Sequence, residues 1–118
     1  MMIDYELFSK LYNEAKSYDS LEWFISERGW QEWMNLFDVD MIAKILEIIY
    51  EYSGFTLKEI RKNLNISRAA FSREYNIPLR TIEDWDAEKS KIPEYTEKLI
   101  KYTLFIKEVF LDVENIAE

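Results

Sequence analysis

The side chains best suited to chemistry in this sequence are arginines and lysines, and they gather in one stretch. Residues 55–93 hold 8 basic and 6 acidic residues, a net charge of +2. Residues 1–54 carry a net charge of −7 and residues 94–118 one of −3, so the whole chain carries −8. A guanidinium group can bond bidentately to guanine, and any cation can neutralise a DNA phosphate. The middle stretch is therefore the candidate for nucleic-acid binding in an otherwise acidic protein.

Catalysis fits this composition poorly. The chain has no histidine and no cysteine, which excludes the commonest general base, imidazole and thiolate metal ligands, and disulfides. Carboxylates are plentiful, but their places in the sequence are typical of helix surfaces and helix caps. No glycine-rich phosphate loop is present either. We therefore expect no enzyme activity, no catalytic or metal site and no cofactor.

The spacing of the apolar residues predicts helices. Hydrophobic residues make up 48% of the chain, and only two glycines and two prolines interrupt it. The apolar positions recur every three or four residues, which is the helical period. We expect an all-α protein with no sheet. The expected helices are Asp4–Lys16, Leu21–Arg28, Met41–Tyr52, Leu57 to about Leu64, Arg68–Tyr75, Pro78–Ala87 and a long helix from Pro93 to about Ile116.

Local signals mark where the middle helices begin and end. Thr56 and Glu59 have capping-box spacing, so that each side chain can bond the backbone N–H of the other residue. Ser67 is a suitable N-cap for the next helix. Asn76 suits the left-handed residue of a tight turn, and Pro78 suits the first position of the helix after it. Two short helices around a sharp turn are therefore expected after Ser67.

The side chains of these two helices divide into an inward and an outward set. Ser72 is small where the helices would cross most closely. The inward apolar set is Phe71, Ile77, Ile82 and Trp85, and the outward set is Leu79, Arg80, Glu83 and Asp84. A helix that presents its first turn to solvent in this way can enter the major groove of DNA.

Four stretches follow one another in a recognisable order. They read LKEIR at 57–61, SRAAFS at 67–72, IPLRTIEDWD at 77–86 and KIP at 91–93. With this order, about residues 55–105, roughly half of the chain, resemble the Xre-type, lambda-repressor/Cro-like helix-turn-helix family. The run from Tyr75 to Trp85 also looks like the version of this family found in proteins of bacteria and their mobile elements.

The resemblance implies a role for particular residues. It places Leu79, Arg80 and Asp84 at positions that read base edges. It places Thr81, Arg68 and Arg73, with Lys89 and Lys91 of the following loop, in surroundings that contact phosphates. It also implies a mostly buried ion pair between Arg61 and Asp86, which ties the first helix of the motif to the end of the recognition helix.

Two positions depart from the family pattern. Glu88 stands where the family usually has the glycine that follows the recognition helix. A positive φ is costly for a glutamate, so we expect this loop to have a different backbone conformation. Asp84 would face a groove lined by phosphates. It either accepts a hydrogen bond from a cytosine amino group or indicates that DNA binding is weak or lost.

The first half of the chain is acidic and aromatic. Trp23, Trp30 and Trp33 could form a ligand cage, but large aromatic side chains more often fill a core, which is what we expect here. We interpret the acidic face as solvated surface, with a role in binding a protein partner as the alternative. The N-terminus lacks the pattern of a signal peptide and no apolar run could span a membrane, so we expect a cytoplasmic protein.

Taken together, these patterns predict an acidic helical unit (residues 1–53) packed on a lambda-repressor-like helix-turn-helix bundle with a long C-terminal helix (residues 54–118). We expect a sequence-specific transcriptional regulator of a bacterium, phage or mobile element that inserts helix 78–87 into double-stranded DNA. One such module makes few contacts, so we also expect a homodimer. The interface would come from the first half or from the last helix, whose candidates Leu104, Phe105, Val109, Phe110 and Val113 could instead fill the monomer core.

A second hypothesis comes from another class of function. The protein would be a protein-binding inhibitor of a nucleic-acid-binding partner, for example a phage anti-CRISPR protein, with the helix-turn-helix kept as a scaffold or autoregulator. The net charge of −7 on residues 1–54 would engage a basic surface of that partner. Fold analogy does not decide between the two hypotheses.

Overall fold

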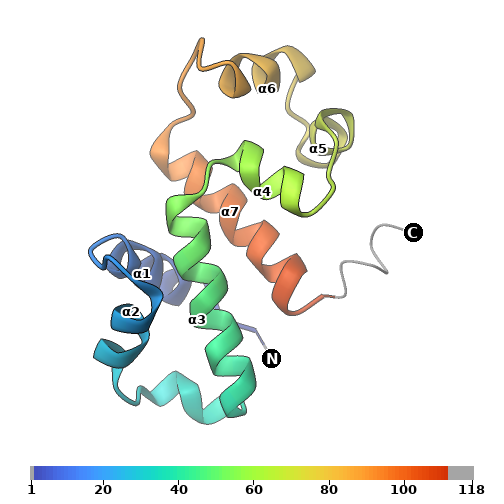
Figure 1. The fold of residues 1–118 in the computed structure, drawn as a ribbon. Helices are drawn as coiled ribbons and strands as arrows, with labels where there is room; N and C mark the ends of the chain where they lie inside the picture. The colour runs from blue at the N-terminus through green and yellow to red at the C-terminus, as the bar shows by residue number, and fades with distance from the viewer. Residues whose placement is uncertain (1, 112–118) are drawn as a thin grey trace. The chain divides into compact units, whose positions relative to one another are not determined.

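Seven α-helices and one 3₁₀-helix make up the computed structural model over the residues it describes, 2–111 (Figure 1). They are α1 (Tyr5–Ala15), α2 (Leu21–Arg28), η1 (Glu32–Leu36), α3 (Val39–Gly54), α4 (Leu57–Asn63), α5 (Arg68–Tyr75), α6 (Leu79–Asp86) and α7 (Glu94–Val109). No strand occurs in this range, which confirms the predicted all-α class. Within the same residues, no helix is long and apolar enough to cross a membrane.

Side-chain caps set the starts of several helices. Asp4 accepts a hydrogen bond from the Leu7 N–H at 2.9 Å before α1. The capping box before α4 is complete, since the Thr56 hydroxyl accepts from the Glu59 N–H and the Glu59 carboxylate accepts from the Thr56 N–H. Ser67 caps α5 in the same way as Asp4 caps α1. The predicted capping box at Thr56 and cap at Ser67 are therefore confirmed, whereas Asp4, expected as the first residue of its helix, is the N-cap.

Several predicted helix ends differ from the structure, α3 by two residues at each end, and two of them are informative. Pro78 has ψ 136° and lies just outside α6, which begins at Leu79. The last helix ends at Val109, well before the predicted end at Ile116. It closes there because the Leu111 N–H bonds back to the Ile106 carbonyl at 3.1 Å. Ile116 lies outside the described residues.

The chain divides into two compact units. Unit 2 spans Phe55–Lys98, and unit 1 groups the chain up to Gly54 with the segment that begins at Leu99. The break after Gly54 lies next to the predicted one. The residues from Leu99 onward were expected in the second domain, whereas here they group with unit 1. Their apolar side chains explain this grouping, because the Phe105 ring of α7 lies 5.1 Å from the Phe8 ring of α1.

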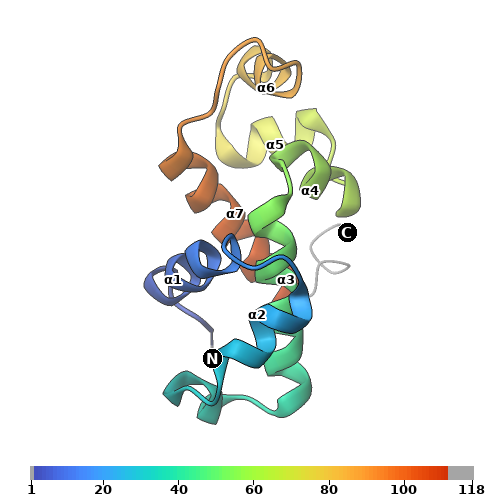
Figure 2. The ribbon, with the colours of Figure 1, turned by 60° about the vertical axis from the view of Figure 1, so that its left-hand side comes forward.

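Unit 1 is built around α3, which α1 and α2 contact (Figure 2). Its largest fully buried side chains are Phe8, Leu11, Phe24, Ile45, Leu46, Ile49, Leu104 and Phe105. For Leu104, Phe105 and Val109, the monomer-core interpretation therefore holds over the dimer-interface one. Phe110 is half-buried, and Val113 lies outside the described residues.

The expectation that the tryptophans of unit 1 fill its core is wrong for two of them. Trp23 is 59% exposed and Trp30 is 64% exposed. The inward position of α2 belongs to Phe24, so its neighbour Trp23 faces away. The Trp30 indole N–H donates to the Asn35 side chain at 2.8 Å on the surface. Trp33 alone is half-buried.

Candidate nucleic-acid interface

A tight turn joins α5 to α6 within unit 2. Asn76 ends α5 with φ 54° and ψ 42°, the left-handed conformation expected of it. The Ile77 N–H donates to the Ser72 carbonyl at 3.1 Å, and the Ser72 hydroxyl donates to the Ile77 carbonyl at 2.6 Å. Ser72 thus bonds the turn through both its backbone and its side chain. The two bonds fix the direction in which α6 leaves the turn.

The inward face of these helices is apolar as predicted. Phe71 of α5 and Ile82 of α6 are each 1% exposed, and the Phe71 ring lies 4.6 Å from that of Tyr75. Ile77 and Trp85 are half-buried. The packing of α6 therefore depends on one side of the helix and leaves the other side to solvent.

Asp86 anchors the C-terminal end of α6. One guanidinium nitrogen of Arg61 lies 2.6 and 2.5 Å from the two Asp86 oxygens, and the two side chains are only 5% and 6% exposed. The ion pair implied by the family resemblance is thus present. The Arg61 guanidinium also lies over the Phe71 ring, 5.4 Å from its centroid.

Arg68 adds a contact that the sequence analysis missed. Its Nε donates to Asp86 at 2.9 Å, although the side chain remains 48% exposed. The prediction placed Arg68 near DNA phosphates only. Asp86 already had an assigned partner, and nothing in the spacing of 18 residues pointed to a second arginine. A single carboxylate therefore ties α6 to both α4 and α5.

The outward face of α6 carries the residues expected to read bases. Leu79 is 43% exposed and the Arg80 side chain is 81% exposed. Arg80 Nε lies 3.4 Å from Asp84, whose side chain is 31% exposed, so the two predicted base readers face each other one turn apart. Thr81 is half-buried beside them. This weak, solvated pair leaves the guanidinium group able to take another partner.

We expected the loop after α6 to depart from the backbone conformation of the family pattern, and this expectation is wrong. Glu88 adopts φ 59°, the conformation that a glycine would supply. Its N–H donates to the Trp85 carbonyl at 3.1 Å, and the Lys89 N–H donates to the Asp84 carbonyl at 2.8 Å. These bonds satisfy the last carbonyls of the helix and offset the strain at Glu88.

The remaining predicted phosphate contacts are solvent-exposed. Arg73 lies on α5, whereas Lys89 and Lys91 follow α6 in the loop. The structure thus brings Leu79, Arg80 and Asp84 together on one helix face and leaves the other cations on flanking segments. Arg68 is partly committed to the Asp86 carboxylate.

Comparisons with known proteins identify no relative of this chain. No protein-family model matches it, and the searches of curated proteins and of solved structures return no match. The resemblance to the helix-turn-helix family therefore depends on the residues quoted above and stays a prediction.

Proposed function

We propose that the protein binds double-stranded DNA and regulates transcription by inserting α6 into the major groove. The observation that carries the proposal is the first turn of α6, where Arg80 is 81% exposed at its side chain while Ile82 behind it is buried. A guanidinium group placed there can bond bidentately to a guanine edge. α5 and its turn then act as the scaffold of a helix-turn-helix.

The local charge supports the same proposal. α6 lies in residues 55–93, which carry a net charge of +2, whereas residues 1–54 and 94–118 each carry a negative net charge. Arg73, which precedes α6 in the sequence, and Lys89 and Lys91, which follow it, are exposed and can contact phosphates. Asp86 does not oppose them, because its charge is paired with two arginines.

A single unit of this size makes few base contacts, so the proposal includes a homodimer on DNA. The half-sites would be about one helical turn of DNA apart. The source is proposed to be a bacterium, phage or mobile element, as the resemblance implies, and the site of action the cytoplasm.

The direct test starts from selection of a binding site out of random duplex DNA. Fluorescence anisotropy with the selected duplex then compares Arg80→Ala with Lys44→Ala, which removes the same charge from an exposed position on α3 in unit 1. Arg80→Ala should weaken binding about tenfold to a hundredfold, whereas Lys44→Ala should leave it nearly unchanged. Failure of the wild-type protein to bind any duplex at low salt would contradict the proposal.

Asp84→Asn distinguishes the two interpretations of that carboxylate. If Asp84 accepts from cytosine, the variant should lose discrimination at one base pair. If Asp84 only repels phosphates, the variant should bind non-specific DNA more tightly and with a steeper salt dependence. Anisotropy titrations against the selected and a scrambled duplex at several salt concentrations separate these results.

The exposed tryptophans favour a second candidate function, the binding of a basic protein partner by unit 1. Trp23 and Trp30 are mostly exposed within the acidic half of the chain, and Trp30 is held in place by Asn35. Tryptophan is enriched at binding hot spots and attracts cations over its ring. A short Arg-Gly repeat peptide should quench tryptophan fluorescence in the wild type and much less in Trp23→Ala/Trp30→Ala. Equal quenching in both would end this candidate.

A further inference from the structure

Arg80 and Asp84 differ in how firmly the fold holds them. The Arg80 side chain is 81% exposed, whereas that of Asp84, one turn later on α6, is 31% exposed. The Asp84 carbonyl accepts hydrogen bonds from two residues of the following loop, from the Lys89 N–H at 2.8 Å and from the Ser90 N–H at 3.4 Å. The backbone of Asp84 is therefore fixed, while the Arg80 side chain reaches into solvent.

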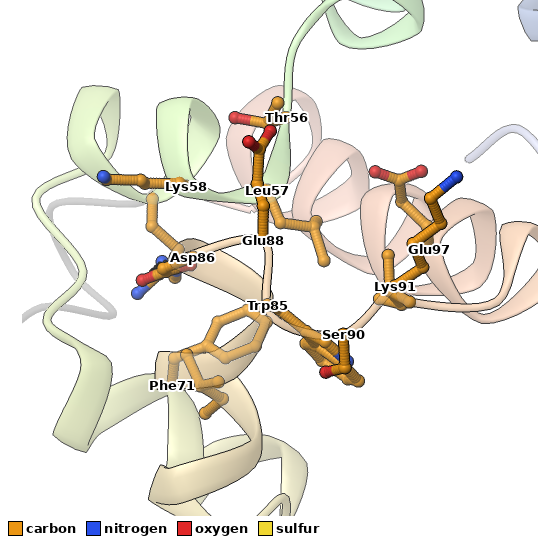
Figure 3. Close-up of a pocket in the computed structure, with 13 residues that line it drawn as sticks. Thr56, Leu57, Lys58, Phe71, Trp85, Asp86, Glu88, Ser90, Lys91 and Glu97 are labelled. Carbon is orange, nitrogen blue, oxygen red and sulfur yellow. Dashed lines mark hydrogen bonds and ion pairs between the residues drawn. The ribbon is translucent and has the colours of Figure 1, made fainter.

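The two residues after Asp84 hold the same part of α6 from its inner side. Trp85 and Asp86 line a cavity of about 810 Å³ together with Phe71 of α5 (Figure 3). Asp86 is also bonded to guanidinium groups of α4 and α5. Asp84 thus lies on a firmly placed stretch of helix. In its pair with Arg80, the carboxylate therefore sets the position of the guanidinium group and not the reverse.

The contact between the two side chains involves one particular nitrogen of Arg80. The Nε atom lies 3.4 Å from Asp84 Oδ1 and donates to it. Among the described residues, the two terminal nitrogens of Arg80 have no hydrogen-bond or ion-pair partner. Because the guanidinium group is a rigid planar fork, a carboxylate at Nε leaves the terminal N–H groups directed away from Asp84. Those groups match the O6 and N7 acceptors that guanine presents in the major groove.

The orientation of Arg80 matters because a free arginine side chain has many conformations. Binding to a base fixes its torsions at a cost in entropy, and a carboxylate that already favours the bound orientation lowers this cost. In water the exposed pair contributes little. Contact with DNA removes water and weakens the screening of both charges, so the attraction between Arg80 and Asp84 becomes stronger in the complex.

We infer that Asp84 is a positioning residue for Arg80: its carboxylate holds Nε so that the two terminal nitrogens bond one guanine through O6 and N7. This role differs from direct readout of a cytosine and from repulsion of phosphates, because the carboxylate acts through Arg80. The inference rests on the proposed DNA binding and specifies a base that α6 reads, a guanine whose recognition needs both side chains.

The test removes one acceptor atom at a time. 7-Deazaguanine, which lacks the N7 acceptor, replaces each guanine of the selected duplex in turn, and fluorescence anisotropy measures the loss of affinity at each position. For the wild-type protein, one position should show a loss of about fivefold. The same replacement should cause almost no loss with Arg80→Ala, which identifies the guanine that Arg80 bonds.

Three variants then test Asp84 at that guanine. Asp84→Ala should reduce the loss on replacement to about twofold or less, although Arg80 is still present. Asp84→Glu keeps a carboxylate near Nε and should restore the full loss. Glu83→Ala is the matched control, since it removes the same charge from an exposed neighbour on α6 and should also keep the full loss. Each result is a ratio of two affinities of one variant, so a general change in attraction to phosphates cancels.

Three results would overturn the inference while DNA binding itself stands. The first is that no guanine shows a loss that depends on Arg80, and the second is that Asp84→Ala keeps the full loss. The third is that Asp84→Ala changes base discrimination in the Arg80→Ala background as well, since the carboxylate would then read a base directly. A wild-type protein that binds no duplex would contradict the proposed function, and the inference with it.

Discussion

Two ion pairs of α6 use the same chemistry in different surroundings. At the C-terminal end, Arg61 and Asp86 form an ion pair whose side chains are 5% and 6% exposed. On the outward face of α6, Arg80 and Asp84 approach to 3.4 Å with side chains 81% and 31% exposed. A buried pair leaves an uncompensated charge when one partner is removed, whereas an exposed pair is screened by water. Burial, and not the residue types, therefore makes one pair an anchor and leaves the other on a surface available to a partner.

Removal of the anchor should have the largest effect. Asp86→Ala leaves the buried Arg61 guanidinium without its carboxylate and also releases Arg68, so it should destabilise the protein by about 3 kcal/mol. Urea unfolding followed by circular dichroism measures the change. Asp84→Ala is the matched variant in the exposed pair and should change stability far less. Equal effects of the two variants would contradict the distinction between the buried and the exposed pair.

The second arginine of the anchor should contribute less than the first. Arg68 makes one bond to Asp86 and is 48% exposed, so Arg68→Ala should cost about 1 kcal/mol after allowance for screening by solvent. A double-mutant cycle with Asp86→Ala isolates the energy of this contact. A coupling energy close to zero would show that Asp86 depends on Arg61 alone.

A small gain in stability is expected at the end of α6. Glu88 adopts φ 59°, which costs a residue with a side chain about 1–2 kcal/mol. Glycine removes this strain but loses more chain entropy on folding, so Glu88→Gly should stabilise by about 0.5 kcal/mol net. The matched variant Asn76→Gly should gain less, because asparagine tolerates its φ of 54°. Midpoints of chemical unfolding compare the two, and a loss of stability in Glu88→Gly would disprove the argument from strain.

The smallest effect on stability is expected at Arg80. Its pair with Asp84 is exposed, and its removal disturbs no core residue, so Arg80→Ala should change the free energy of unfolding by less than about 0.5 kcal/mol. The same variant should lose DNA affinity in the titration proposed above. A large loss of stability would mean that Arg80, like Arg61, holds the fold together.

Most helix boundaries could be predicted because caps are local. The Thr56 box, the Ser67 cap and the left-handed Asn76 each depend on residues within a few positions, and all three are present. Arg61 and Asp86 are 25 residues apart in sequence, and their ion pair was predicted only from the family resemblance. The bond from Arg68 had no such guide, because only tertiary packing brings its helix to Asp86.

The surface of unit 1 could not be predicted from hydrophobicity. Trp23 and Phe24 are adjacent and both apolar, so the sequence does not say which one faces inward. The eight residues of α2 offer α3 a narrow contact, which Phe24 fills. The preference for glycine at the position of Glu88 is a statistical tendency of helix ends. Here the hydrogen bonds that the Glu88 and Lys89 N–H groups donate at the end of α6 outweigh it.

Because Arg61 and Arg68 both bond Asp86, the local unfolding of unit 2 should be cooperative. Its carboxylate accepts from guanidinium groups on α4 and α5, so the end of α6 cannot separate without releasing both helices at once. Amide protons throughout the three helices should then exchange with solvent in one cooperative event and not helix by helix. Asp86→Ala should break this cooperativity, so that α6 exchanges ahead of α4 and α5.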